Sequence, residues 1–221
     1  MDKIFNILAK TNGLLGVYAN VGFGKTTFML QVVEEINRRK NGTAIIFELE
    51  EFKEHIQKRI KNLKIDNERI ILCDDSELTR AKIENYINQA GSVSILCIDN
   101  LSLVDEVVAS ELYNIANKYQ IPILFTKNLG RDSGDYDINC RPELYSIWDF
   151  RKGKNSIEWN TLDKYSFLAF LHREHKCYRG VGTAKRYDIS SRTELIIKRC
   201  KAIGPFSAFM EWSEKERRFN Y

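Results

Sequence analysis

Residues 19–27, ANVGFGKTT, carry the glycines and side chains that could bind a chain of phosphates. Consecutive backbone N–H groups in such a loop form a concave site for phosphate oxygens, and the positive end of a following helix dipole strengthens it. Gly22 and Gly24 permit backbone dihedrals and a close approach that a side chain would block. The spacing predicts that Lys25 contacts the β- and γ-phosphate oxygens and that the Thr26 hydroxyl binds Mg²⁺.

The loop departs from the pattern GxxxxGK[ST] at one position, because Ala19 stands where the first glycine is usual. An ordinary glycine-rich helix start with an exposed lysine is the alternative. An apolar run precedes the loop and a helical pattern follows it, which is the context that a phosphate loop requires. We therefore predict nucleotide contacts from the whole loop: Ala19, Asn20, Val21, Gly22, Phe23, Gly24, Lys25, Thr26 and Thr27.

Carboxylates follow two other apolar runs. Residues 93–98 end in Asp99, at the strand edge where ligands bind in parallel α/β sheets, and we predict that Asp99 holds a magnesium-bound water. Capping of the next turn is the alternative role for Asp99. Glu48 and Glu50 close residues 44–47 and face one side of an extended chain. Either could orient a water that attacks the γ-phosphate, or both could be solvated members of the run ELEEFKE.

Short apolar runs alternate with amphipathic segments from residue 14 to about 126, which indicates βαβ units in a mostly parallel α/β sheet. The expected strands are residues 14–18, 44–47, 70–73, 93–98 and 121–126. The expected helices are residues 25–39, 51–63, 77–89 and 103–119, with Asn41-Gly42 stopping the first of them.

The pattern changes after Thr126. Residues 128–146 have no periodicity and predict a long loop, and strand-like runs follow at residues 165–171, 193–198 and 207–212, separated by basic loops. Since no linker or repeat is visible, we predict a single domain over residues 1–221. It comprises a core at 12–127, the loop at 128–146 and C-terminal strands at 147–221.

Composition sets limits on the function. The chain has 221 residues and a net charge of +4, which neither requires nor excludes a nucleic-acid partner. No apolar run is long enough to span a membrane, and the short N-terminal one does not suit a secretory signal. The five scattered cysteines show no CxxC pair and are expected to be reduced, which predicts a cytoplasmic protein.

The order of the motifs resembles the C-terminal ATPase domain of DnaB-type replicative helicases, which are RecA-like hexameric motors. After ANVGFGKTT come FELE, CID and FTK, then RPELYSIWDFRKGKNSIE, FLAFLHRE and TELIIKRCKAIGP, in the family's order from about residue 12 to residue 221. The resemblance implies a RecA-like P-loop core with C-terminal antiparallel strands. It also implies ATP and Mg²⁺ as ligands, single-stranded DNA as a partner, and an oligomer with composite ATP sites.

Roles follow from matching positions. The resemblance makes Glu50, rather than Glu48, the glutamate that activates water. Thr126 and Lys127 match a polar sensor of the γ-phosphate.

Two basic groups also match the family. Arg199 and Lys201 match a finger that reaches the nucleotide of a neighbouring subunit, and a solvent-facing strand edge is the alternative. Arg151, Lys152 and Gly153 match a loop that contacts the DNA backbone, and a solvated loop is the alternative.

The sequence also departs from the family. It begins almost at the P-loop strand, so we expect it to lack the N-terminal domain and linker helix, and the interval from Glu50 to Asp99 is short. The finger reads Arg-Cys-Lys, and Lys152 stands where an acidic residue is typical. Besides a P-loop kinase that transfers phosphate to a small molecule, two hypotheses remain. One is a Mg²⁺-dependent ATPase that acts on DNA in replication or recombination. The other is a nucleotide-switched module that docks on a replication partner without motor activity.

Overall fold

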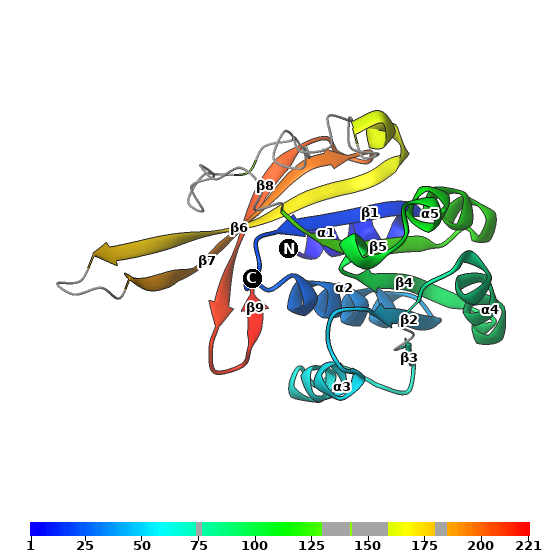
Figure 1. The fold of residues 1–221 in the computed structure, drawn as a ribbon, viewed down its shortest axis with the longest axis horizontal. Coiled ribbons are helices and arrows are strands. Elements are labelled where there is room, and N and C mark those ends of the chain that lie inside the picture. Colours follow the sequence, from blue (N-terminus) through cyan, green and yellow to red (C-terminus); the bar gives the residue numbers. More distant parts are fainter. Residues whose placement is uncertain (74–76, 130–141, 143–158, 180–184) are drawn as a thin grey trace.

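The computed structural model describes residues 1–73, 77–129, 142, 159–179 and 185–221. Within them the strands form one sheet in the order β3-β2-β4-β5-β1-β6-β7-β8-β9 (Figure 1). The pairs from β3 to β6 are parallel and those from β6 to β9 are antiparallel, which confirms the predicted sheet. The strands are β1 Gly13–Ala19, β2 Thr43–Glu48, β3 Ile70–Cys73, β4 Val93–Asp99, β5 Pro122–Asn128, β6 Tyr165–Arg179, β7 Lys185–Cys200, β8 Phe206–Ser213 and β9 Arg218–Asn220.

Helices cover both faces of this sheet. The first three pack with one hydrophobic cluster and the last two with the other, on the opposite face. The helices are α1 Asp2–Lys10, α2 Lys25–Arg39, α3 Lys53–Asn62, α4 Arg80–Ala90 and α5 Glu106–Tyr119, and short 3-10 turns occur at η1 Leu101–Leu103 and η4 Trp159–Lys164. None of the described helices is long and apolar enough to cross a membrane.

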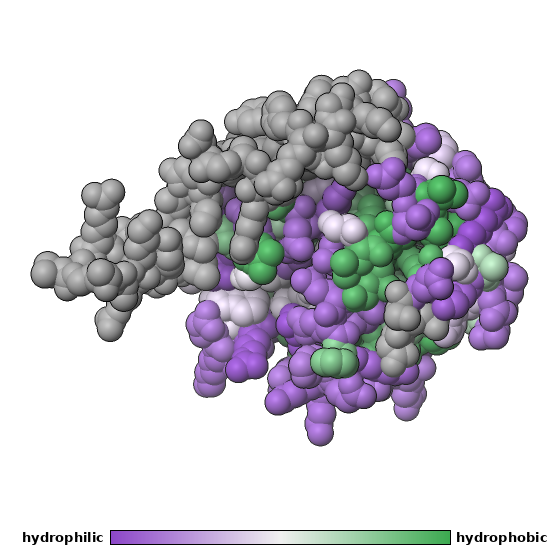
Figure 2. All heavy atoms as spheres, viewed as in Figure 1, coloured by the Kyte–Doolittle hydropathy of each residue, from purple (hydrophilic) through white to green (hydrophobic). Residues whose placement is uncertain are grey.

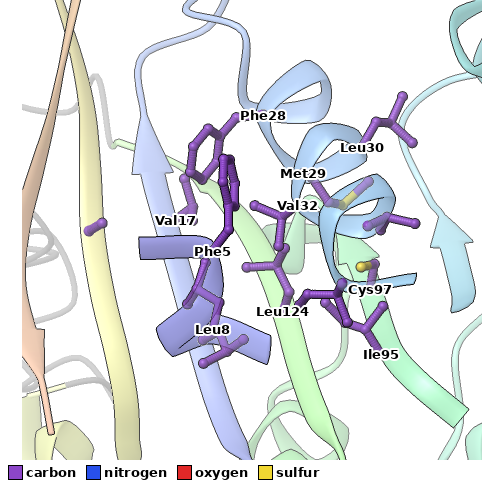
Figure 3. Packing of buried hydrophobic residues seen from close by; sticks show 14 of the residues in the cluster. Phe5, Leu8, Val17, Phe28, Met29, Leu30, Val32, Ile95, Cys97 and Leu124 are labelled. Atoms are coloured by element: carbon purple, nitrogen blue, oxygen red, sulfur yellow. The ribbon is translucent and has the colours of Figure 1, made fainter. Parts of the chain in front are cut away.

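The cluster beneath α2 fixes the helix that begins at the phosphate loop. Its side chains come from α1, from α2 and from one face of the central strands (Figure 3). They include Phe5, Leu8, Val17, Phe28, Met29, Val32, Ile95, Cys97 and Leu124. Burying one such side chain contributes about 1.5–3 kcal/mol, so this packing holds the first turn of α2 firmly against the ends of β1 and β4.

Several parts of the fold differ from the sequence-based expectation. α1 was not expected, and it forms because Ile4, Phe5 and Leu8 bury one side of a short helix. The predicted strands at residues 165–171 and 193–198 are only parts of the much longer strands β6 and β7. The predicted basic loop between them is wrong over the described residues, because Arg179 still pairs with Lys185 (Figure 1).

Local chemistry explains the shifted helix ends. α5 begins at Glu106 rather than at residue 103, because the Asp105 carboxylate accepts a hydrogen bond from Val107 N at 2.8 Å and caps the helix. α2 ends at Arg39, its predicted last residue, and the Asn41-Gly42 pair follows it. The predicted loop at 128–146 falls mostly outside the described residues, but Asn128 belongs to β5.

β9 was also missed, and it brings the C-terminal residues back to α2. The Gln31 side chain donates to Phe219 O and accepts from Phe219 N, both at 2.9 Å. The Phe219 ring packs edge-on against Phe28. The β8–β9 hairpin is therefore tied to the helix that follows the phosphate loop.

The cysteines that the structure describes in full, Cys73, Cys97 and Cys200, are buried and not in disulfides. Burial raises the pKa of the Cys97 thiol. These three cysteines act as small apolar residues, as expected.

Hydrophilic residues cover much of the face shown in Figure 2. Hydrophobic side chains reach the surface near β5 and α5. The exposed large hydrophobic residues include Leu103 of η1 and Val107 of α5.

Candidate nucleotide-binding site

The segment between β1 and α2 has the shape of a phosphate loop. Gly22 and Gly24 have φ angles of 82° and 87°, in the left-handed region that glycine tolerates. Phe23 N donates to Asn20 O at 3.3 Å, and the Phe23 side chain is buried in the core. Phe28 N donates to Gly24 O at 2.9 Å and begins the helical ladder. The loop is thus a tight turn that ends at a helix N-terminus.

Lys25 folds back over this turn. Its Nζ donates to Ala19 O at 3.4 Å and to Asn20 O at 3.3 Å, and the side chain is only 7% exposed. Burial lowers the pKa of Lys25, while the carboxylates of Asp99 and Glu50 act in the opposite direction. The ammonium group therefore lies inside the bend of the loop and not in solvent.

Asp99 joins three elements at the end of β4. Its Oδ2 accepts from Thr26 Oγ1 at 2.6 Å, and its Oδ1 accepts a short hydrogen bond from Thr126 Oγ1. The Thr126 hydroxyl in turn accepts from Asn100 N at 2.9 Å. Asn100 Oδ1 accepts from Ser102 N and caps the following turn. The capping role that was the alternative for Asp99 is therefore filled by Asn100.

The two candidate glutamates have different surroundings, because β2 ends at Glu48 and the chain then turns. Glu50 lines the cavity at the loop, and its Oε2 accepts from Asn100 Nδ2 at 3.2 Å. Glu48 is buried, and its Oε1 accepts from Glu50 N and Glu51 N. Burial and the nearby Asp99 raise the pKa of Glu48 to about 7. Of the pair, Glu50 is the one that faces the cavity.

This cavity has a volume of about 370 Å³. The loop, the first residues of α2 and Glu50 form part of its wall. The lining residues that were not predicted from the sequence include Asn128 at the end of β5, Trp212 of β8 and Arg217 in the β8–β9 turn. Asn128 Oδ1 is buried without a hydrogen-bond partner among the described residues.

Asn128 also changes the interpretation of the predicted sensor pair. Adjacent residues of a strand point to opposite faces, so Thr126 and Asn128 share a side and Lys127 lies on the other. Thr126 contacts Asp99, and Asn128 lines the cavity. Lys127 is not part of the cavity wall. Side chains along β5 alternate between the two faces of the sheet, and this alternation could have identified Asn128 from the sequence.

Trp212 is held in place by its neighbours. Its Nε1 donates to Glu214 Oε1 at 2.7 Å, and its ring centroid lies 5.1 Å from that of Phe219. The Arg173 guanidinium lies 5.4 Å from the centroid of the Trp212 ring. No local sequence pattern connects Trp212 to the loop, because the two are far apart in the sequence and the fold of β8 and β9 brings them together.

The predicted finger lies away from this cavity. Arg199 pairs with Leu168, which lies at the level of Gly16 in the middle of β1, and it does not line the cavity. Its Nε donates to Tyr165 O at 2.9 Å, and its Nη2 lies 3.2 Å from Asp163. Lys201 is exposed in the turn after β7. β7 lies between β6 and β8, but β8 pairs with it only as far as Ile197, so at Arg199 the strand is paired on the β6 side alone.

The predicted DNA loop, Arg151, Lys152 and Gly153, lies outside the described residues.

The residues at the loop suit Mg²⁺. This cation prefers oxygen ligands and usually keeps several waters. The Thr26 hydroxyl and the Asp99 carboxylate place such oxygens side by side at the helix start. No group of three His, Cys, Asp or Glu side chains in the described parts of the chain forms another metal site.

Comparison with known proteins supports the fold. No protein-family model matches the sequence, and no curated protein matches it significantly. The structure is similar to a solved ATPase domain, with a TM-score of 0.72 and 15% identity over 95% of this chain and 84% of that one. It is also similar to a DnaB-like replicative helicase solved for its interactions with primase, with a TM-score of 0.70 and 17% identity. That match covers 95% of this chain but only 58% of the helicase. The chain therefore shares the fold of DnaB-like helicase ATPase domains, which confirms the fold that the order of its motifs predicts.

Proposed function

We propose that the chain binds ATP with Mg²⁺ at this loop, hydrolyses it, and acts on DNA in replication or recombination. The observation that carries the proposal is the 2.6 Å hydrogen bond from Thr26 to Asp99. It joins the start of α2 to the end of β4, with Glu50 facing the same cavity.

The loop and Lys25 bind the phosphate chain. Backbone N–H groups at the start of α2 and the helix dipole attract phosphate oxygens. Lys25 exchanges the carbonyl oxygens of Ala19 and Asn20 for phosphate oxygens, which are stronger acceptors because they are charged. The base and ribose of the nucleotide would contact Trp212 and Arg217, which also line the cavity.

Thr26 and Asp99 would hold Mg²⁺, the hydroxyl directly and the carboxylate through a bound water. The ion supplies positive charge that offsets the phosphate oxygens. Thr126 keeps the Asp99 carboxylate in one orientation by donating to its other oxygen.

Glu50 orients the attacking water. Asn100 holds one of its oxygens at 3.2 Å, which leaves the other to accept the proton as the water oxygen bonds to the γ-phosphorus. The bond from the γ-phosphorus to the bridging oxygen breaks, and phosphate and ADP leave. Asn128, with its unpartnered buried oxygen and its amide N–H₂, lies on the same wall and contacts the γ-phosphate or the water.

A DNA partner and an oligomer are supported by the likeness to helicase domains and by the position of the finger. Arg199 and Lys201 do not line the cavity of their own chain, so in a composite site they would serve the nucleotide of another subunit. In that role they would stabilise charge that develops on the transferred phosphoryl group.

One observation favours the second candidate, a nucleotide-switched module that docks on a replication protein. Arg199 is bound within its own chain to Tyr165 O and lies beside Asp163. A finger that stays in these contacts delivers no charge to a neighbour, and the chain would then bind ATP without rapid turnover.

Nucleotide binding tests the site. We expect the Lys25→Ala variant to bind a fluorescent ATP analogue with Mg²⁺ about 100-fold more weakly than the wild-type chain, because it loses a charged contact. Lys40→Ala is the control, since Lys40 is a partly buried lysine just beyond the other end of the same helix. Hydrolysis at the wild-type rate by Lys25→Ala would show that the site is assigned wrongly.

Sedimentation with an ATP analogue and single-stranded DNA separates the two candidates. The ATPase that acts on DNA assembles and hydrolyses ATP faster when DNA is present. The switch module stays monomeric, turns ATP over slowly and ignores DNA.

A further inference from the structure

Glu48 occupies an unusual place beside the proposed catalytic glutamate. It is the last residue of β2, and its side chain is only 2% exposed. In the register of β2 and β4 it pairs with Asp99, so two acidic residues stand side by side at the edge of the sheet. A carboxylate buried next to another carboxylate is unfavourable unless its surroundings offset the loss of water.

One oxygen of Glu48 organises the turn that follows β2. Oε1 accepts from Glu50 N at 2.8 Å and from Glu51 N at 2.7 Å. Hydrogen bonds to a carboxylate are roughly twice as strong as neutral ones, and two of them on one oxygen fix the backbone of both donors. The carboxylate therefore sets the direction in which the Glu50 side chain leaves the turn.

The side chains beyond this turn are fixed at their other ends. Asn100 donates to Glu50, and Arg59 Nη2 donates to Glu51 Oε1 at 2.5 Å. The two side chains diverge, one toward the network around Asp99 and the other toward α3. Glu48 is the common anchor from which both depart.

The second oxygen of Glu48 has no such use. Oε2 is buried and makes no hydrogen bond to any described residue. The cost of burying this oxygen is offset by the two hydrogen bonds that the other oxygen accepts.

We infer that Glu48 is a positioning residue for ATP hydrolysis, which holds the backbone of Glu50 so that its carboxylate meets the attacking water. This inference rests on the proposed ATPase function. It assigns the three acidic residues of the turn separate roles: Glu48 anchors, Glu50 acts on water and Glu51 pairs with Arg59.

Steady-state kinetics of three variants test the inference. Glu48→Ala removes the acceptor, and we expect kcat to fall about 10- to 100-fold while KM for ATP stays within about threefold, because a displacement of the base affects the chemical step. Glu48→Gln keeps an acceptor oxygen and restores kcat to within about fivefold of wild type. Asp105→Ala is the matched control, since it removes a carboxylate cap from a backbone N–H at α5, away from the cavity.

Three outcomes would overturn the positioning role of Glu48. A Glu48→Ala variant with wild-type kcat overturns the inference, as does a parallel loss in Glu48→Gln and Glu48→Ala. A fall in kcat of the same size in Asp105→Ala also overturns it, because the effect would then reflect general destabilisation.

Amide hydrogen exchange keeps the inference testable if the wild-type chain hydrolyses no ATP. In that case the proposed function fails, but the anchoring still predicts protected amides at Glu50 and Glu51. We expect Glu48→Ala to speed their exchange about tenfold or more and Glu48→Gln to leave it near the wild-type rate. Equal exchange in all three proteins would refute the anchoring itself.

Discussion

The Thr26 hydroxyl donates to the Asp99 carboxylate at 2.6 Å, although the two residues are 73 positions apart in the sequence. Thr26 belongs to the first turn of α2 and Asp99 to the last position of β4. The contact exists because α2 packs over the sheet and brings its N-terminus to the edge where the parallel strands end. One hydrogen bond thus connects a local loop motif with a carboxylate that the fold supplies.

Replacing Asp99 tests this connection. Asp99→Asn keeps the shape of the side chain but removes its charge, so it weakens the hold on a magnesium-bound water. We expect kcat to fall about 100-fold and the Mg²⁺ concentration for half-maximal rate to rise. A magnesium titration of ATPase activity measures both, and Asp2→Asn, at an exposed residue at the start of α1, serves as control. An unchanged magnesium dependence would contradict the role of Asp99.

The wall formed by Trp212 predicts a loss of nucleotide affinity without a loss of chemistry. Trp212→Ala removes an aromatic surface beside Gly24, and we expect the Kd for ATP to rise about tenfold. Trp212→Phe keeps a ring and should retain most of the affinity. Calorimetry of binding and kcat at saturating ATP separate the two effects. Full affinity in the alanine variant would place the base elsewhere.

Gly24 should tolerate no side chain. A Cβ there would lie 2.8 Å from the Phe219 ring, and its φ of 87° already disfavours other residues. We expect Gly24→Ala to lower the free energy of unfolding by about 2–4 kcal/mol, from backbone strain and overpacking together. Urea denaturation measures the change. Gly91→Ala is the matched control, because Gly91 also has a positive φ but open space around its Cβ, so it should lose only the backbone part.

Glu48 predicts a specific pH dependence of stability. Its pKa is about 7 in the folded chain and near the ordinary 4.5 in the unfolded one, so the folded state binds the proton more tightly. This contribution to stability is complete below about pH 4.5 and is lost as the pH rises through about 7. Glu48→Gln cannot ionise, so its stability relative to wild type should improve between about pH 5 and 8. Denaturation midpoints across this range check the sign, and parallel curves would contradict it.

Much of this architecture was predictable, because it depends on short-range patterns. The loop at residues 19–27 combines glycines, a lysine and a threonine in consecutive positions, and the apolar run before it and the helical pattern after it place it at a sheet edge. α2 and β3 begin and end at the predicted residues. Asp99 follows directly from its place after an apolar strand.

The remaining parts depend on contacts between distant segments. Trp212 and Arg217 line the cavity only because β9 binds Gln31, which no local pattern reveals. Spacing alone left Glu48 and Glu50 equivalent, and the turn that separates them becomes visible only with its hydrogen bonds. The lengths of β6 and β7 were missed because backbone pairing continues through polar residues as readily as through apolar ones.

The hairpin that closes onto α2 also has a consequence for the order of events during synthesis. The phosphate loop lies near the start of the sequence, whereas Trp212 and Arg217 lie near its end. The ribosome therefore makes the loop long before these two residues. Until β8 and β9 have been made, the phosphate loop of the nascent chain lacks the cavity wall that Trp212 and Arg217 form. Affinity for nucleotide should therefore rise further, by the contribution of Trp212, once this hairpin has closed onto α2.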